Sequence, residues 1–233
     1  MSSPLVSVIM AVRNGERFLD QAIQSVLNQD YPSLEILVID GQSSDRTREI
    51  ACSYPEIRYT YQLSTGIANA YNLGIESSHG EMIAFLSHDD LWRPQKISLQ
   101  VDFLERFPEV GYVIGETRYF LEPGCVFPSQ FLRKDILDKT WTLRMMEIVL
   151  IRRQVFKQVG MFEPSFSTAE DIDWFARADD AKITMGVVPQ ILLDKRIHDR
   201  NISIFSNNHR LNLFSALRKS AQRKQVIEKE VKE

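Results

Sequence analysis

The sequence has few cysteines and no long hydrophobic segment. Cys52 and Cys125 are the only cysteines among 233 residues, and neither lies in a CxxC motif or a His/Cys cluster. This excludes a disulfide framework and a structural zinc site, and two unpaired thiols are typical of a reducing compartment. No apolar run approaches the roughly 18 residues that span a bilayer. The N-terminal MSSPLVSVIM has no charged region before its apolar stretch, so it does not predict a signal peptide. We therefore expect a cytoplasmic location and no transmembrane segment.

An excess of charge of one sign is also absent. The chain has 28 basic and 31 acidic residues and a net charge of -3. The basic surface that binds nucleic acid is therefore missing, and we expect no nucleic acid among the partners. Hydrophobic residues make up 44% of the chain, which excludes intrinsic disorder and supports a core without disulfides.

The N-terminal half alternates apolar runs of strand length with amphipathic stretches of helix length. The apolar runs predict strands at 5–12, 34–39, 57–62, 82–86 and 111–115. The stretches between them predict helices at 18–27, 43–53, 66–77 and 94–107. Repeated strand–helix–strand units indicate an α/β fold, with an open, mostly parallel, Rossmann-like sheet and helices on both faces.

From residue 116 the alternation becomes irregular. We expect loops over 116–140, followed by a strand-like segment and two helices, at 146–152, 154–159 and 169–177. Pro189 and Gln190 predict a turn between strands at 183–188 and 191–196. Residues 208–233 predict a C-terminal helical extension rich in lysine and arginine. The simplest interpretation of that helix is a solvated cap on the domain, and the alternatives are a peripheral membrane contact or a dimer helix.

Polar clusters follow three of the predicted buried strands. They are RNGE at 13–16, DGQS at 40–43 and SHDD at 87–90. Because ligands bind beyond the carboxyl ends of parallel strands, we expect the three clusters to converge on one site. Carboxylates at such an edge suit a divalent cation and its phosphate ligand, which indicates a nucleotide site.

The usual phosphate-binding loops are missing from the sequence. No G-x-G-x-x-G follows the first predicted strand and no GxxxxGK[ST] occurs, which argues against dinucleotide and P-loop sites. A bound diphosphate would therefore need its charge neutralised by a metal, and Mg²⁺ or Mn²⁺ held by one or two carboxylates would do this.

Six segments, in order along the chain, resemble one protein family. They are SVIMAVRNGERFLDQAIQSVLNQDYPSLEILVIDGQSSDRT, GIANAYNLGI, GEMIAFLSHDDLW, LIRRQVFKQVGMFEP, AEDIDWFAR and RIHDRNIS. These segments resemble the inverting nucleotide-diphospho-sugar glycosyltransferases of family 2, which have the GT-A fold. The resemblance implies an enzyme that moves a sugar from a nucleotide sugar, most often a UDP-sugar, to an acceptor hydroxyl with inversion. It also implies Mn²⁺ or Mg²⁺ as the cofactor that stabilises the leaving diphosphate.

The resemblance assigns roles to matched residues. Asp89 aligns with the second carboxylate of the D-x-D motif, the usual metal ligand, and His198 with a late histidine that often approaches the diphosphate or metal. Glu170 and Asp171 match the acidic pair that contains the general base, and we assign the base role to Asp171. The residues expected at the nucleotide sugar are Ala11, Arg13, Asn14, Glu16, Asp40, Ser43, Asn69, Asn72, Ser87, His88 and Asp89.

Two positions depart from the family pattern. Ser87 replaces the first D-x-D carboxylate, so a second metal ligand would come from His198 or from water. Asn69 stands where many relatives carry aspartate, which changes the expected contacts to the donor sugar.

The resemblance also implies the organisation of the chain and its partners. It spans about residues 5–205, which indicates one GT-A domain over 1–207 and a C-terminal helix over 208–233. Within the domain we expect a nucleotide-binding half at 1–115 and an acceptor half at 116–207. The acceptor would be a saccharide, a lipid-linked molecule or a peptide, in surface polysaccharide or glycolipid assembly. A lipid-linked acceptor would agree with a peripheral contact at the inner face of the membrane.

The candidate residues also have structural interpretations. Asp40 is compatible with a strand-ending turn, Asp89 with a helix cap, and Glu170 with a favourable charge at a helix N-terminus. Two other functions remain as alternatives. One is a catalytically weak nucleotide-sugar-binding module, suggested by Ser87. The other is a nucleotidyltransferase, which the absence of a glycine-rich basic loop disfavours.

Overall fold

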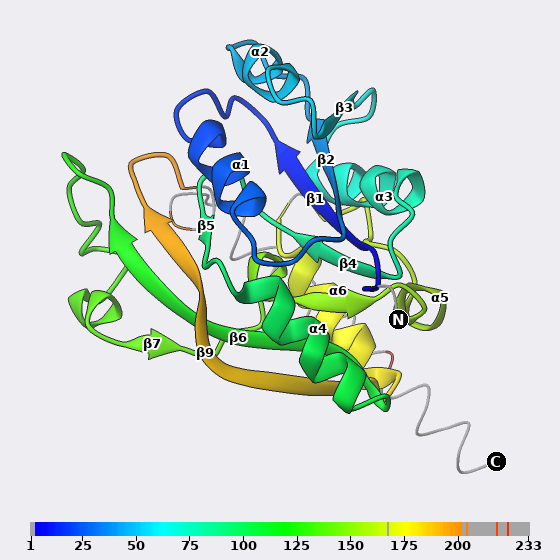
Figure 1. The fold of residues 1–233 in the computed structure, drawn as a ribbon. Coiled ribbons are helices and arrows are strands. Elements are labelled where there is room, and N and C mark those ends of the chain that lie inside the picture. Colours follow the sequence, from blue (N-terminus) through cyan, green and yellow to red (C-terminus); the bar gives the residue numbers. More distant parts are fainter. Residues whose placement is uncertain (1–2, 167, 202–203, 205–217, 219–222, 224–233) are drawn as a thin grey trace.

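The strands of the described chain form one sheet at the centre of the molecule (Figure 1). This computed structural model describes residues 3–166, 168–201, 204, 218 and 223. Apart from the single positions 218 and 223, the predicted C-terminal helix at 208–233 lies outside the described residues. The strand order is β3-β2-β1-β4-β8-β6-β9-β5, with β7 paired to β6. The strands are β1 (Val6–Val12), β2 (Leu34–Asp40), β3 (Ile57–Tyr61), β4 (Met82–Phe85), β5 (Leu91–Trp92), β6 (Val110–Leu121), β7 (Thr140–Trp141), β8 (Leu150–Arg152) and β9 (Thr184–Ile197).

The first four strands pair in parallel with one another, as β6 and β9 do further along the sheet. β1 lies between β2 and β4, and β3 pairs with β2 on the outer side. Both faces of β1 are covered, which is why its sequence is a continuous apolar run rather than an alternating one. The four strand ends therefore point the same way, and the polar residues that follow them are brought to one edge.

Helices cover both faces of this sheet (Figure 1). They are α1 (Leu19–Leu27), α2 (Thr47–Cys52), α3 (Ile67–Ser77), α4 (Lys96–Arg106), α5 (Val155–Val159) and α6 (Glu170–Asp180), with 3₁₀ turns η1 (Lys134–Leu137) and η2 (Met146–Ile148). Right-handed crossovers place α1 and α2 on one face and α3 on the other, because the chain reverses direction across the sheet after β3. On the α3 face, aromatic rings of α3, α5 and α6 pack together, among them Tyr71, Phe156 and Trp174. The predicted fold class is confirmed.

Two predictions for the second half were wrong. The loops expected over 116–140 begin later, because β6 continues to Leu121, and β9 passes through Pro189 and Gln190 without a turn. Ile114 pairs with Val187, whereas Glu116 pairs with Ile191, so the extra residues of β9 form a bulge. Proline is tolerated in strands at bulges because its missing N–H breaks no ladder there. Gly115 faces this bulge, where a Cβ would overlap the Leu192 side chain.

The β6–β9 pair joins the first four strands through β8, which runs antiparallel to both β4 and β6. The predicted strand at 146–152 is divided, since η2 occupies its first residues and β8 its last. Among the described residues, no helix is long and apolar enough to cross a membrane.

Candidate active site

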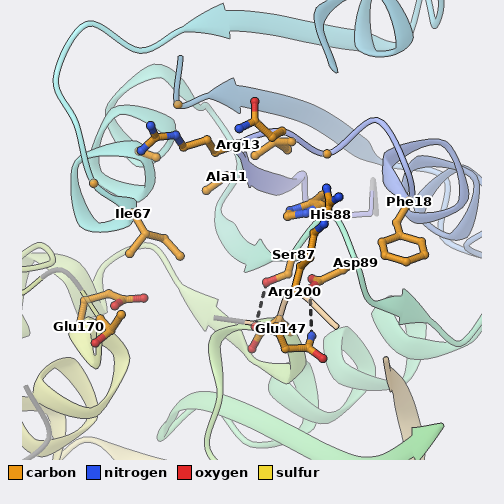
Figure 2. A pocket seen from close by; sticks show the side chains of 18 of the residues that line it. Ala11, Arg13, Phe18, Ile67, Ser87, His88, Asp89, Glu147, Glu170 and Arg200 are labelled. Carbon is orange, nitrogen blue, oxygen red and sulfur yellow. Dashed lines mark hydrogen bonds between the residues drawn. The ribbon is translucent and has the colours of Figure 1, made fainter. Parts of the chain in front are cut away.

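A cavity of about 530 Å³ lies at the carboxyl edge of the parallel strands (Figure 2). Residues 11–15 line it after β1, Gly41 after β2, Gln62 after β3, and residues 87–89 after β4. The clusters at strand ends therefore meet as their positions in the sequence predict. Further lining residues come from the second half of the chain and complete the walls: Glu147, Thr168, Ala169, Glu170, Asp171, Lys195, His198, Arg200 and Asn201.

The structure brings most of the sequence-predicted site residues to this cavity. Those that line it are Ala11, Arg13, Asn14, Ser87, His88, Asp89, Glu170, Asp171 and His198. Glu16, Asp40, Ser43, Asn69 and Asn72 are not among the lining residues, and each of the five has hydrogen-bond partners of its own within the fold.

Asp40 and Ser43 hold the loop that follows β1. Asp40 is buried, and its carboxylate accepts hydrogen bonds from the Ser43 backbone N–H at 2.9 Å and the Tyr59 hydroxyl at 2.7 Å. Ser43 Oγ in turn accepts the Asn14 backbone N–H at 2.8 Å. Asn14 has a φ of 53°, a left-handed conformation that asparagine tolerates better than most residues. These bonds support the backbone beneath Asn14 at the cavity wall.

Glu16, Asn69 and Asn72 also bond to backbone groups. The Asn72 side chain donates to the Phe162 carbonyl at 2.8 Å and accepts the Phe162 N–H at 2.9 Å. Asn69 donates to Thr65 O, one turn earlier, and Glu16 accepts the Arg46 N–H. Asn72 thereby ties α3 to the segment before α6, which carries the opposite wall of the cavity.

Asp89 and His198 form the centre of one wall. His198 Nδ1 accepts the Arg200 backbone N–H at 3.1 Å, so we assign the ring proton to Nε2, which donates to Asp89 Oδ2 at 3.0 Å. Asn201 donates to the same oxygen at 3.3 Å. Burial opposes ionisation of Asp89, but the His198 hydrogen bond and nearby positive charges outweigh it and hold its pKa well below the usual range. Asp89 is therefore a carboxylate at neutral pH.

The donor set around Asp89 fits a magnesium-type site with few protein ligands. Within the described residues, no three His, Cys, Asp or Glu side chains form a metal-holding group. Mg²⁺ is commonly bound by one or two carboxylates plus substrate phosphates and water. Asp89 Oδ1 accepts no hydrogen bond from any described residue, so this oxygen is available to a cation. His198 would have to release Asp89 and lose its Nε2 proton before that nitrogen became a ligand.

A buried charge network lies behind Asp89. Lys195 Nζ donates to Asp90 Oδ2 at 2.8 Å and to Glu147 Oε1 at 3.2 Å. Burial opposes the charge on Lys195, but these carboxylates raise its pKa well above the ordinary value. Asp90 Oδ1 also accepts the Arg196 backbone N–H at 2.9 Å, which ties the turn after β4 to β9.

Sequence reasoning missed Glu147 and Lys195. Glu147 is a charged residue between the apolar Met146 and Ile148, and a charge in such a segment needs a partner, so that local signal was available. Lys195 stands between the charged Asp194 and Arg196 and gives no comparable signal.

The wall of the cavity that faces Asp89 contains the first residues of α6. Ala169 precedes this helix with a φ of 66°, a left-handed conformation that costs a residue with a Cβ about 1–2 kcal/mol. Burial and the charge of Asp171 raise the pKa of Glu170 to about 8, and burial and the charge of Glu147 raise the pKa of Asp171 to about 6. At neutral pH Glu170 therefore keeps its proton, while Asp171 is mostly ionised and can accept one.

This sheet, with its cavity at the carboxyl edge, is the mixed α/β fold of the GT-A glycosyltransferases. TarS from S. aureus in complex with UDP-GlcNAc matches with a TM-score of 0.75 and 18% identity, over 94% of this chain and 66% of that one. A mannosyltransferase from Pyrobaculum calidifontis in complex with GDP-Man and Mn²⁺ matches with a TM-score of 0.67 and 21% identity, over 86% and 59%. At these identities the likeness shows the fold.

The sequence comparisons show the family. The model of Glycosyl transferase family 2 matches residues 7–160. A Rickettsia typhi uncharacterized glycosyltransferase is 32% identical over 209 residues, covering 84% of this chain and 65% of that protein. A Rickettsia conorii relative is 33% identical and is covered over only 36% of its length. The putative teichuronic acid biosynthesis glycosyltransferase TuaG of Bacillus subtilis is 28% identical, over 86% of this chain and 82% of TuaG. The chain belongs to glycosyltransferase family 2.

Proposed function

We propose that the chain transfers a sugar from a nucleotide-diphospho-sugar, by preference a UDP-sugar, to an acceptor hydroxyl with inversion of the anomeric carbon. The observation that carries this proposal is the placement of two kinds of carboxyl group on facing walls of one cavity. Asp89 lies on the wall built by the parallel strands, and Glu170 lies across from it (Figure 2). Asp171, the next residue of α6, also lines the cavity. A diphosphate at the first wall and an acceptor hydroxyl at the second would have the sugar between them.

The donor end of the cavity follows the first strand. Ala11, Arg13 and Asn14 line it, and we assign them to the nucleotide. The Arg13 guanidinium adds a positive charge beside a ligand that carries a diphosphate. When bound at Asp89, with His198 as a second ligand, Mn²⁺ or Mg²⁺ would neutralise the charge that develops on the leaving diphosphate. TarS, which binds UDP-GlcNAc, supports a UDP-sugar as the donor.

Asp171 acts as the general base in this proposal. Its carboxylate accepts the proton of the acceptor hydroxyl while that oxygen attacks the anomeric carbon. The bond between that carbon and the diphosphate oxygen breaks on the opposite face, which gives inversion. Glu170 keeps its proton near neutral pH, so the wall carries one negative charge rather than two against the incoming acceptor.

The acceptor and its setting are proposed from the chain's relatives. The name of TuaG supports polysaccharide biosynthesis as the setting, with a saccharide, lipid-linked or peptide acceptor bound by residues of the second half. We place the reaction in the cytoplasm, and a lipid-linked acceptor would bring the enzyme to the inner face of the membrane.

Calorimetric titration with nucleotides tests the donor class. We expect one of UDP, GDP and dTDP, with UDP favoured, to bind in the presence of Mn²⁺ and to lose affinity when the metal is removed. Asp89→Ala should abolish this metal-dependent binding. Asp102→Ala, an exposed carboxylate on α4 outside the cavity, should leave it unchanged. Absence of binding of all three nucleotides by the unaltered protein would contradict the proposal.

The binding-module alternative rests on Ser87, where a carboxylate of the motif is missing. A transfer or donor-hydrolysis assay separates it from the enzyme, because a binding module would hold the nucleotide sugar and release no nucleoside diphosphate.

A further inference from the structure

A carboxylate from another part of the chain lies beside Ser87, the first residue of the turn after β4. Ser87 Oγ donates a hydrogen bond to Glu147 Oε1 at 2.8 Å (Figure 2). Glu147 belongs to η2, 60 residues further along the chain. Glu147 thus adds a negative charge to the part of the cavity that Ser87 lines.

Glu147 is fixed in place from several sides. Its carbonyl oxygen accepts the Trp92 indole N–H at 2.8 Å, and Lys195 Nζ donates to its Oε1 at 3.2 Å. Burial opposes ionisation of Glu147, but the charge of Lys195 and the hydrogen bonds to the carboxylate, from the Glu147 backbone N–H, Ser87 and Lys195, outweigh it. They lower the pKa of Glu147, so it is ionised at neutral pH. The side chain is 16% exposed and lines the cavity. A carboxylate held this firmly is pre-organised to contact a ligand.

The two oxygens of this carboxylate differ in the side chains that bond to them. Both described hydrogen bonds from other side chains reach Oε1, and no described side chain donates to Oε2. Because Glu147 lines the cavity, this oxygen can accept a hydrogen bond from a donor group of a bound ligand.

The position of Glu147 indicates which part of the ligand it meets. It lies between Asp89 on one wall and Glu170 on the other (Figure 2), and its charge is among the causes that raise the pKa of Asp171. In the proposed reaction the diphosphate is bound at Asp89 and the acceptor hydroxyl at Asp171. The group between these two is the transferred sugar.

We infer that Glu147 is a specificity-determining residue, which accepts a hydrogen bond from a hydroxyl or amide N–H of the donor sugar through Oε2. This inference deepens the proposed function and rests on it. A carboxylate has only acceptor atoms, so it favours a sugar with a donor group at that position and disfavours the corresponding deoxy sugar.

Binding of a nucleotide sugar and of its bare nucleotide separates a sugar contact from other roles. The affinities of UDP, UDP-glucose, UDP-galactose and UDP-N-acetylglucosamine are measured by calorimetry with Mn²⁺ for the unaltered protein and for Glu147→Gln. We expect Glu147→Gln to weaken the preferred UDP-sugar by roughly 10- to 100-fold, the range for a hydrogen bond to a charged group, and to leave UDP unchanged. The differences in affinity among the three UDP-sugars should become smaller in Glu147→Gln.

Glu122→Gln is the matched control. Glu122 is also 16% exposed and is paired with Arg196, the neighbour of Lys195, but it does not line the cavity. We expect Glu122→Gln to leave the affinities for UDP and for the UDP-sugar unchanged. Ser87→Ala is a second variant, which frees Glu147 from one of its hydrogen bonds and should weaken the UDP-sugar without weakening UDP.

Three outcomes would overturn the inference. If Glu147→Gln binds the UDP-sugar as tightly as the unaltered protein does, Glu147 does not contact the donor sugar. Ser87→Ala provides the same test if Glu147→Gln does not fold. If UDP weakens as much as the UDP-sugar, the contact is with the diphosphate or its metal. If the unaltered protein binds none of the four ligands, the proposed function itself fails, which Glu147→Gln alone would not show.

Discussion

At the start of α6, two adjacent carboxyl groups have different protonation states near neutral pH. Burial raises the pKa of both groups, to about 8 for Glu170 and to about 6 for Asp171. A buried pair of this kind avoids two adjacent negative charges by keeping one proton. The difference supports Asp171 as the group that receives the acceptor proton.

Replacing Asp171 with asparagine should slow the chemical step without preventing nucleotide binding. We expect Asp171→Asn to lower kcat by roughly 10²- to 10⁴-fold, the contribution typical of a general base, with unchanged affinity for UDP. Asp179→Asn, at the exposed end of the same helix, is the control. Full transfer by Asp171→Asn would move the base role to Glu170.

The rate should depend on pH through the same carboxylate. A base must be ionised to accept a proton, so kcat/KM should be constant above the Asp171 pKa and fall as the pH drops through about 6. The Glu147 charge contributes to that raised pKa, so Glu147→Gln should move the acid limb to lower pH. A pH profile of both proteins checks this, and an acid limb near the pKa of an ordinary aspartate would contradict it.

Among the elements, α3 is fitted closely to β1. A Cβ at Gly74 of α3 would overlap the Ile9 side chain, which is fully buried. We expect Gly74→Ala to destabilise the protein by about 1–3 kcal/mol, as overpacking of a core does. Urea denaturation measures it, and Glu76→Ala on the exposed side of α3 should change stability little. A stabilised Gly74→Ala would mean that helix propensity outweighs the overlap.

The elements also show how far the sequence determines the fold. β1, β2, β4, α1 and α3 follow the predicted ranges closely, since each is a short apolar run or stripe that is locally recognisable. β6 and β9 do not, because Pro189 and Gln190 have the local pattern of a turn. The long-range pairing with β6, which absorbs them in a bulge, leaves no mark within the segment itself.

The candidate site also has features that the sequence predicts and features that it does not. Topology alone predicts that residues after β1, β2 and β4 meet at one edge, and they do. Lys195 and Glu147 are 48 residues apart, and their contact depends on how β9 and η2 pack together. Asp40 and Ser43 have the right residue types at the right strand end, yet neither side chain faces the cavity, because each is used by the neighbouring loop.

At the scale of the whole molecule, ligand binding should raise the unfolding temperature, Tm. A ligand that binds only the folded state at about 100 times its Kd adds about 2.7 kcal/mol, or roughly 5–10 °C in Tm for a chain of this size. We expect UDP with Mn²⁺ to give this rise, and chelation of the metal or Asp89→Ala to remove it. An equal rise with UDP alone would contradict the assigned role of Asp89.

The pairing of β9 with β6 also has a consequence for synthesis. β9 is the last of the described strands along the chain, so it leaves the ribosome after the others. It contributes Lys195 and ends directly before His198. Before β9 is synthesised, the nascent chain contains the parallel strands β1 to β4 but only part of the cavity wall. One edge of β6 is then unpaired. Such edges invite association between chains, and long-range pairing forms slowly. The wall of the cavity is therefore complete only after β9 pairs with β6, and until then the exposed edge of β6 can associate with other chains.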